Sequence, residues 1–339
     1  MSISAMFEFP VQIWVMCEAL ATEYSSGYGE LRFNVALPTG MPPFGGAPDV
    51  PGIASHIKVT GDQVVWAQEY GAFVPESLRP ATALHRVVMT DVDGPIYDHA
   101  SWFTPDNQLA EYVEPWFNEV RTWVEVMTGQ DLDPNHRVYD AELVGVGLTF
   151  IEPPHNGSTG MKITTPRIRP LRAQEWADIL GFVRDGKQPP LEEVLSRDAR
   201  AAQRRHANRR AIIDAATALE IALGRYIRGM ADQLPPAQQG RLDKQPTLGA
   251  YISIAENSGL QLAVPIERLQ WLSRLRNDAA HRGEETSDRE AVNAVQVMLD
   301  FLGTHGLITR TGELDSDGSE WTLVDSENLE TGASGMDSR

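Results

Sequence analysis

The chain has little cysteine and little lysine. Cys17 is the only cysteine among 339 residues, so one chain can form neither an internal disulfide nor a thiolate zinc site, and we expect a reducing, cytoplasmic compartment. No apolar run approaches ~18 residues, and no basic segment precedes the first apolar stretch. We therefore expect neither a membrane span nor a secretory leader. With only four lysines, arginine supplies almost all the positive charge, and its planar guanidinium suits phosphate.

Positive charge is also scarce overall, with 29 lysines and arginines against 47 acidic residues and a net charge of −18. The net negative charge of such a chain repels the phosphates of nucleic acid, which excludes a protein that coats nucleic acid over its whole surface. Any nucleic-acid site must therefore be a local basic patch. The charge is uneven, because residues 313–339 hold eight acids and one arginine, whereas Arg197–Arg210 holds six arginines and one aspartate. This arginine block either binds RNA phosphates or is a solvated helix face that balances the chain's own acids.

Strand-like patterns dominate the first half of the chain. Apolar or alternating runs predict strands at Phe9–Cys17, Leu31–Leu37, Ala83–Thr90 and Glu142–Ile151, and a hairpin from His56–Thr60 with Gln63–Trp66. The proline- and glycine-rich segment Thr39–Gly52 predicts a long loop. Apolar residues that recur at three and four from Asn107 to Met127 predict an amphipathic helix. Residues 1–170 are therefore expected to form an α+β domain, whose role as a sensor or regulator is not specified by its residues.

Helical periodicity takes over after residue 170. The predicted helices are Ala173–Arg184, Leu191–Arg205, Asn208–Met230, Thr247–Asn257, Pro265–His281 and Asp288–Leu302. The last of them opens with a capping box formed by Ser287 and Glu290. The fold class is thus α+β, with a mixed strand-rich domain followed by an all-α bundle of four or more helices over residues 171–305. The acidic segment 306–339 is expected to be a disordered tail.

The residues with the clearest chemistry lie in the segment Leu275–His281. On an ideal helix the leucines and Ala279 form one buried arc, Arg276 falls inside that arc, and Asn277 and His281 share its edge four residues apart. A guanidinium inside an apolar arc is costly unless it is paired or lies at an interface. Arg276 is therefore either a buried structural ion pair or a residue that faces a polar groove between helices or subunits.

An imidazole beside a fixed cation and an amide forms a set that can cleave RNA. The histidine would move a proton at the 2′-hydroxyl or at the leaving 5′-oxygen, and the arginine would hold the phosphate and stabilise its developing charge. This chemistry needs no metal and no cofactor, and the sequence contains no convincing cluster of metal ligands.

The string Arg-Asn-x-x-x-His late in a helical bundle resembles the signature of HEPN domains, and the helix Arg210–Leu223, with its Ala-Leu-Glu core, resembles the long helix of that family. The resemblance covers about residues 190–303. It implies a HEPN-like bundle that acts as a metal-independent endoribonuclease, in a bacterial defence, toxin–antitoxin or stress system, leaving 2′,3′-cyclic phosphate and 5′-hydroxyl ends. It also implies that Arg276, Asn277 and His281 are catalytic, that two motifs face each other in a homodimer, and that RNA and an antitoxin or regulatory partner bind.

Other members of that family keep the bundle without cleavage, so the alternative is a non-catalytic module for dimerisation, ligand sensing or assembly. Glu220 either pairs with Arg276 or orients His281, or it is an exposed helix-edge residue paired with Arg225 or with solvent. Full burial of Arg276 against Glu220 would favour the non-catalytic module, and a solvent-reachable cleft lined by arginines would favour the enzyme. The candidate RNA-binding arginines are Arg205, Arg209 and Arg282.

Overall fold

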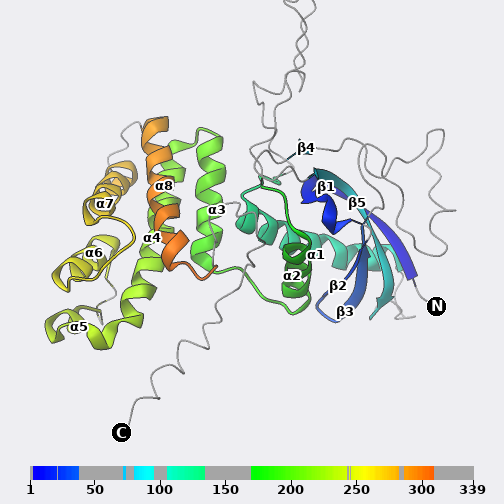
Figure 1. Cartoon of the computed structure of the whole chain (residues 1–339), viewed down its shortest axis with the longest axis horizontal. Helices are drawn as coiled ribbons and strands as arrows, with labels where there is room; N and C mark the ends of the chain where they lie inside the picture. Colours follow the sequence, from blue (N-terminus) through cyan, green and yellow to red (C-terminus); the bar gives the residue numbers. More distant parts are fainter. Residues whose placement is uncertain are drawn as a thin grey trace, which may run out of the picture. The chain divides into compact units, whose positions relative to one another are not determined.

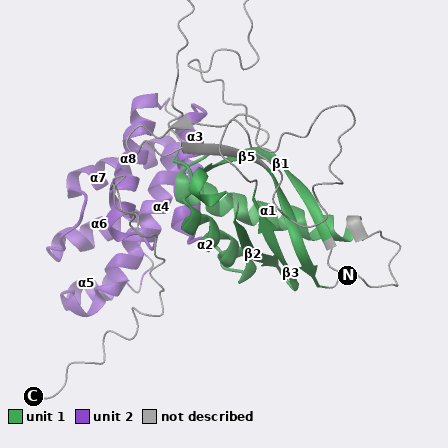
Figure 2. Ribbon diagram, turned by 45° about the vertical axis from the view of Figure 1, so that its right-hand side comes forward, with its two compact units in different colours: residues 1–188 green, residues 189–339 purple. Residues whose placement is uncertain are grey.

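The computed structural model of the chain describes residues 3–20, 22–37, 72–73, 80–94, 105–133, 169–242, 244, 246–281 and 286–308. The chain divides into two compact units, residues 1–188 and residues 189–339, coloured separately in Figure 2. The first unit contains a sheet with two helices, and the second is entirely helical among its described residues. The fold is therefore α+β, as expected from the sequence.

The first unit is built on an antiparallel sheet. Its strands are β1 (Ile3–Met16), β2 (Glu23–Tyr28), β3 (Leu31–Ala36), β4 (Ala72–Phe73) and β5 (Pro80–Asp93), and a short 3₁₀ turn, η1 (Cys17–Ala19), follows β1. The strand order is β1-β5-β3-β2, and β4 pairs with one end of β5. Gly29, with a φ of 57°, makes the tight turn between β2 and β3, because glycine adopts this left-handed conformation without steric cost.

Two helices, α1 (Pro105–Thr128) and α2 (Ala173–Arg184), pack on one face of this sheet (Figure 1). Ser26 of β2 faces both helices, because its hydroxyl accepts a hydrogen bond from Trp116 Nε1 at 2.9 Å and donates to the carbonyl oxygen of Leu180 at 3.3 Å. Phe33 pairs with Ser26 across β2 and β3, and its ring packs edge-on against Trp116. The predicted amphipathic helix over 107–127 is confirmed, and its tryptophans belong to the core.

The predicted strands at 9–17, 31–37 and 83–90 are confirmed as parts of β1, β3 and β5. The expected loop at 39–52, the hairpin at 56–66 and the strand at 142–151 lie outside the described residues. The sequence did not predict β2. The division between the units falls at residues 188 and 189 rather than at 170 and 171, because α2 packs on β2 and α1 and buries Trp176 completely.

The second unit is a helical bundle. Its elements are α3 (Leu191–Arg204), α4 (Asn208–Gly229), the 3₁₀ turn η3 (Ala231–Gln233), α5 (Pro236–Leu242), α6 (Leu248–Asn257), α7 (Ile266–His281) and α8 (Asp288–His305). Each predicted helix after residue 190 is confirmed, and α5 was not predicted. Ser287 and Glu290 form the expected capping box of α8, with the Glu290 amide donating to Ser287 Oγ at 3.3 Å.

Helix α4 is the centre of this bundle, since α3, α6, α7 and α8 all pack against it (Figure 1). It is lined with small side chains that allow this close approach: Ala211, Ala215, Ala218 and Ala222 recur every three or four residues and are fully buried. Larger apolar side chains alternate with them, including Leu219 and Leu223. No helix in the described part of the chain has both the length and the apolar composition needed to cross a bilayer.

Candidate functional site

The Arg-Asn-x-x-x-His motif lies in the last two turns of α7. Arg276 is half-buried, whereas Asn277 and His281 are exposed. Arg276 Nη1 donates a hydrogen bond to Asn277 Oδ1 at 3.2 Å, so the amide holds the guanidinium without cancelling its charge. The motif therefore presents a cation, an amide and an imidazole that solvent can reach.

One side of α7 is anchored in the bundle along the length of the helix, and this holds the motif in place. Leu269, Leu272 and Ala279 are fully buried against the bundle, which confirms these members of the predicted apolar arc, whereas Leu275 is only half-buried. Pro265 precedes the helix, and its carbonyl accepts from the Arg268 amide at 3.0 Å in the first turn. The buried residues anchor one side of α7, and Arg276 lies at the border between this side and solvent.

A contact from α4 reaches the end of α7. Arg209, in the first turn of α4, donates from Nη2 to the carbonyl oxygen of Ala280 at 3.2 Å. At the other end of the two helices, Tyr226 Oη donates to the carbonyl oxygen of Gln261 at 3.3 Å, so α4 and α7 run antiparallel. The start of α4, which carries the end of the arginine block, therefore lies beside the motif, next to His281.

Glu220 lies away from this end of α7. It follows Arg209 by 11 residues on α4, and at 1.5 Å per residue it stands about 16 Å further along the axis. Among the described residues, Glu220 forms no ion pair with Arg276. Arg225, which the alternative interpretation paired with Glu220, instead contacts Glu192 at 3.0 Å. The structure thus brings Arg209 to the motif and leaves Glu220 half-buried on the middle of α4.

The arginine block is only partly available to a ligand. Arg210 Nε lies 3.2 Å from Asp214 Oδ2, and Arg197 Nη2 lies 2.7 Å from Asp198 Oδ1, so carboxylates offset both charges. Burial raises the pKa of Asp214, although the hydrogen bond and charge of Arg210 oppose that rise.

Of the other two candidate RNA-binding arginines, Arg205 and Arg282, the structure describes only the first. Arg205 is the half-buried residue that follows α3 as its C-cap, and its amide donates to the carbonyl oxygen of Ala201 at 3.2 Å. Arg282 lies outside the described residues. Arg209 is therefore the candidate RNA-binding arginine that the structure places beside the motif.

The turn between α3 and α4 orients the start of α4. Its amides at His206 and Ala207 donate back to the carbonyls of Gln203 and Ala202, the pattern of a Schellman motif. His206 occupies the left-handed position of this motif, with a φ of 55°, where glycine is usual. Because no glycine marks the site, the sequence contained no clear signal for this geometry.

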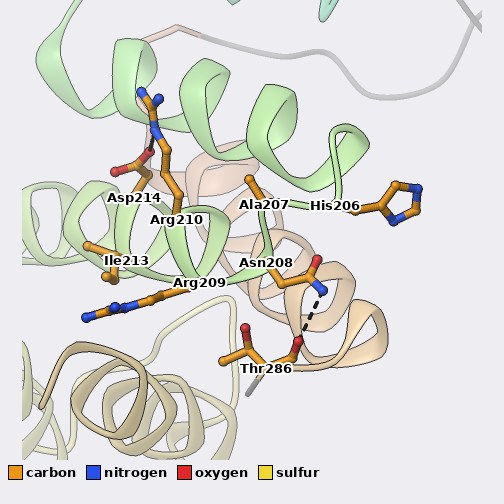
Figure 3. A pocket seen from close by; sticks show the side chains of 8 residues that line it. All are labelled: His206, Ala207, Asn208, Arg209, Arg210, Ile213, Asp214 and Thr286. Atoms are coloured by element: carbon orange, nitrogen blue, oxygen red, sulfur yellow. Dashed lines mark hydrogen bonds and ion pairs between the residues drawn. The ribbon is translucent and has the colours of Figure 1, made fainter. Parts of the chain in front are cut away.

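Side chains of this turn, of the first two turns of α4 and of Thr286 line an open hollow of about 650 Å³ (Figure 3). Asn208 Nδ2 donates to the carbonyl oxygen of Thr286 at 3.1 Å and to Asp288 Oδ1 at 2.8 Å. His206 Nδ1 lies 3.2 Å from Asp288 Oδ2. The hydrogen bonds from Asn208 and then from His206 lower the pKa of Asp288. These contacts, which the sequence did not reveal, fasten the start of α8 to the start of α4.

Figure 3 also shows that Arg209 and Arg210 leave α4 in different directions, and that His206 points away from both. The basic side chains that line the hollow therefore do not converge on a single point. Among the described residues, no group of three or more histidine, cysteine, aspartate or glutamate side chains is placed to hold a metal ion.

Comparison of the chain with protein-family models, with curated proteins and with solved structures finds no match.

Proposed function

We propose that the helical unit is a HEPN-type endoribonuclease that cleaves RNA without a metal ion. The observation that supports this proposal is the state of the motif: Arg276 is half-buried and bonded to a neutral amide, and His281 is exposed. A purely structural arginine would be expected in a buried ion pair, which is the arrangement that the non-catalytic alternative required. The geometry therefore favours the enzyme over the assembly module.

The proposed reaction is an attack of the RNA 2′-oxygen on the adjacent phosphorus. His281 takes the proton of the 2′-hydroxyl as the P–O bond forms, and the bond from phosphorus to the 5′-oxygen breaks. A protonated histidine returns a proton to the leaving oxygen, which gives a 2′,3′-cyclic phosphate and a 5′-hydroxyl. Arg276 stabilises the charge on the phosphoryl oxygens, and Asn277 orients the guanidinium through its 3.2 Å hydrogen bond.

One motif offers a single histidine, and the reaction uses both a base and an acid. We therefore propose a homodimer in which the motifs of two chains share one cleft, so that each supplies one proton-transfer group. RNA is the proposed substrate, and a regulatory or antitoxin partner would limit the activity. With a single cysteine, Cys17, buried in the first unit, the proposed compartment is the cytoplasm.

The test is cleavage of RNA by the full chain in the presence of EDTA, with analysis of the product ends. His281→Ala should slow cleavage by about 10²–10⁴-fold, the usual contribution of a general acid or base. His206→Ala is the matched control, since it also removes an exposed histidine of the same unit. Arg276→Gln should slow cleavage by about 10²–10³-fold, whereas Arg274→Gln, an exposed arginine of the same helix, should not.

Three results would overturn the proposal. The first is cleavage by the wild-type chain that requires a divalent metal. The second is cleavage that survives both His281→Ala and Arg276→Gln at the wild-type rate. If the wild-type chain is dimeric but cleaves no RNA under any of these conditions, the non-catalytic assembly module replaces the nuclease.

A further inference from the structure

The first unit contains a pocket of about 730 Å³ between α1 and the N-terminal half of β1. We refer to it as the β1–α1 pocket. Its volume lies within the range of sites that hold small molecules, ~300–1,000 Å³. All of its lining residues belong to the described part of the first unit.

The floor of this pocket is apolar and follows from the register of the sheet. Ala5 pairs with Met89 and Phe7 pairs with Val87, so these four side chains share the face that α1 covers. The Phe7 and Phe117 ring centroids lie 5.4 Å apart. Aromatic and sulfur-containing side chains thus form a wall suited to a hydrocarbon chain or ring.

The wall contributed by α1 changes character along the helix. Leu109, Val113, Phe117 and Arg121 are spaced four residues apart and all line the pocket, so they form one stripe. The first three are buried apolar residues, and the fourth is a half-buried arginine. The stripe therefore begins as a hydrophobic surface and ends, about 18 Å further along the axis, in a guanidinium.

Arg121 forms no ion pair with any residue that the structure describes. Its Nε is fully shielded from solvent and has no hydrogen-bond partner among the described residues. A shielded donor that forms no hydrogen bond destabilises the folded chain, so this position of the guanidinium calls for an explanation. Arg121 as a whole is only half-buried, so an anionic group in the pocket would reach the guanidinium at its terminal nitrogens, where it would accept hydrogen bonds and match the positive charge.

The other charged residues of the pocket do not compensate Arg121. Glu8 lies 3.5 Å from Arg86 of the neighbouring strand, so its charge is already offset. Glu114 is exposed and precedes Arg121 by seven residues, about 10 Å along the helix axis. The anion-binding end of the pocket is therefore the Arg121 end, and the opposite end is apolar.

We propose that the β1–α1 pocket binds a small amphipathic carboxylate, with its carboxylate on Arg121 and its apolar body against Phe7, Met89 and Phe117. This inference concerns a different unit from the nuclease motif and does not depend on it. It gives the first unit a ligand of stated chemistry, an acyl chain or aromatic ring that ends in a carboxylate.

The experiment is a calorimetric titration of the full chain with octanoate and with octan-1-ol, which differ in the charge of the head group. The wild-type chain should bind octanoate about tenfold or more tightly than the alcohol, because only the carboxylate forms a charge-assisted hydrogen bond. Arg121→Gln should remove this difference by weakening octanoate binding alone. Repeating the titration with 2-naphthoate and 2-naphthol tests an aromatic body in the same way.

Three further variants separate the site from the rest of the surface. Ala110→Trp places a large side chain at an exposed position of the pocket wall and should abolish binding of both head groups without disturbing the core. Glu114→Gln should tighten carboxylate binding a few-fold by removing a like charge. Arg184→Gln, which removes an exposed arginine paired with Asp185, is the matched control and should change neither affinity.

These titrations can either support the proposal or overturn it. It is overturned if neither carboxylate binds the wild-type chain, if carboxylate and alcohol bind equally, or if Arg121→Gln leaves octanoate affinity unchanged while its circular dichroism matches the wild type. Loss of carboxylate preference in Arg121→Gln, together with loss of all binding in Ala110→Trp, supports it. A failure of RNA cleavage would leave these results unaffected.

Discussion

The contact between Arg209 and the end of α7 leads to a quantitative prediction for the substitution Arg209→Met. Methionine keeps an apolar stem but removes the guanidinium that donates to the Ala280 carbonyl oxygen at 3.2 Å. A charge-assisted hydrogen bond contributes about 1.5–3 kcal/mol when shielded, but this one is exposed to solvent. A cation at an exposed helix C-terminus contributes about 0.3–1 kcal/mol. We therefore expect the last turn of α7 to lose about 0.5–1 kcal/mol.

This loss should appear as faster amide hydrogen exchange in the last turn of α7. A change of 0.5–1 kcal/mol raises the open population about two- to fivefold, whereas exchange in the middle of α4 should stay at the wild-type rate. Arg210→Met is the matched control, because Arg210 pairs with Asp214 on its own helix. If exchange at Ala279–His281 is the same in Arg209→Met and Arg210→Met, the contact does not stabilise the end of α7.

Two further predictions concern the buried polar groups of the bundle. Arg225→Met should lower the free energy of unfolding by about 3–5 kcal/mol in chemical denaturation, because it leaves the 5%-exposed Glu192 carboxylate without its partner. A double variant that adds Glu192→Met should recover most of this loss. If it recovers none, the ion-pair explanation is wrong. Burial and then the charge of Arg225 lower the pKa of His305 below its usual 6.5, so the unfolded chain binds the proton more readily. The stability due to neutral His305 is thus present above pH 6.5 and is lost as the pH falls through 6.5 and below, and His305→Gln should flatten that decline in denaturation midpoints measured across this range.

Helix positions were predictable from the sequence because caps, prolines and apolar spacing act locally. The capping box at Ser287 and the apolar spacing of α7 are examples, and both were confirmed. Strand β2 was not predictable in this way, since its sequence EYSSGY has few of the β-branched and apolar residues typical of strands. It is a strand because it pairs with β3 along its whole length, and its Ser26 also contacts Trp116 and the Leu180 carbonyl, which are 90 and 154 residues away.

The same distinction applies to the candidate site. The motif residues share one helix, so their spacing placed Asn277 and His281 on a common edge before the structure was known. The Arg209 contact spans 71 residues and depends on the antiparallel arrangement of α4 and α7, which periodicity does not encode. Glu220 was predicted to support the site because it is an acidic residue in an apolar run, but it lies about 16 Å along the α4 axis from Arg209, which is the residue beside the motif.

The distribution of paired and unpaired charge in the helical unit gives a last prediction, which rests on the proposed nuclease function. Arg209 and Arg276 are hydrogen-bonded to a neutral carbonyl and a neutral amide, so both keep their charge for a phosphate. Arg210, in the densest part of the arginine block, is instead offset by the Asp214 carboxylate. Each phosphate contact to single-stranded RNA contributes about 0.7 to the slope of log affinity against log salt.

Arg209→Gln and Arg276→Gln should therefore each reduce that slope by about 0.7, measured by fluorescence anisotropy with a substrate RNA whose 2′-hydroxyls are methylated to prevent cleavage. Arg210→Gln should leave the slope nearly unchanged, because the Asp214 carboxylate already offsets the charge of Arg210, which is therefore expected to make no phosphate contact. Equal reductions in all three variants would mean that the whole arginine block binds RNA. A reduction confined to Arg210→Gln would place the RNA on the α3–α4 side, away from the motif. Only a loss confined to Arg209 and Arg276 fits a phosphate held at the end of α7, because Arg276 lies in the last two turns of that helix and Arg209 donates to its Ala280 carbonyl, whereas Arg210 pairs with Asp214 on α4.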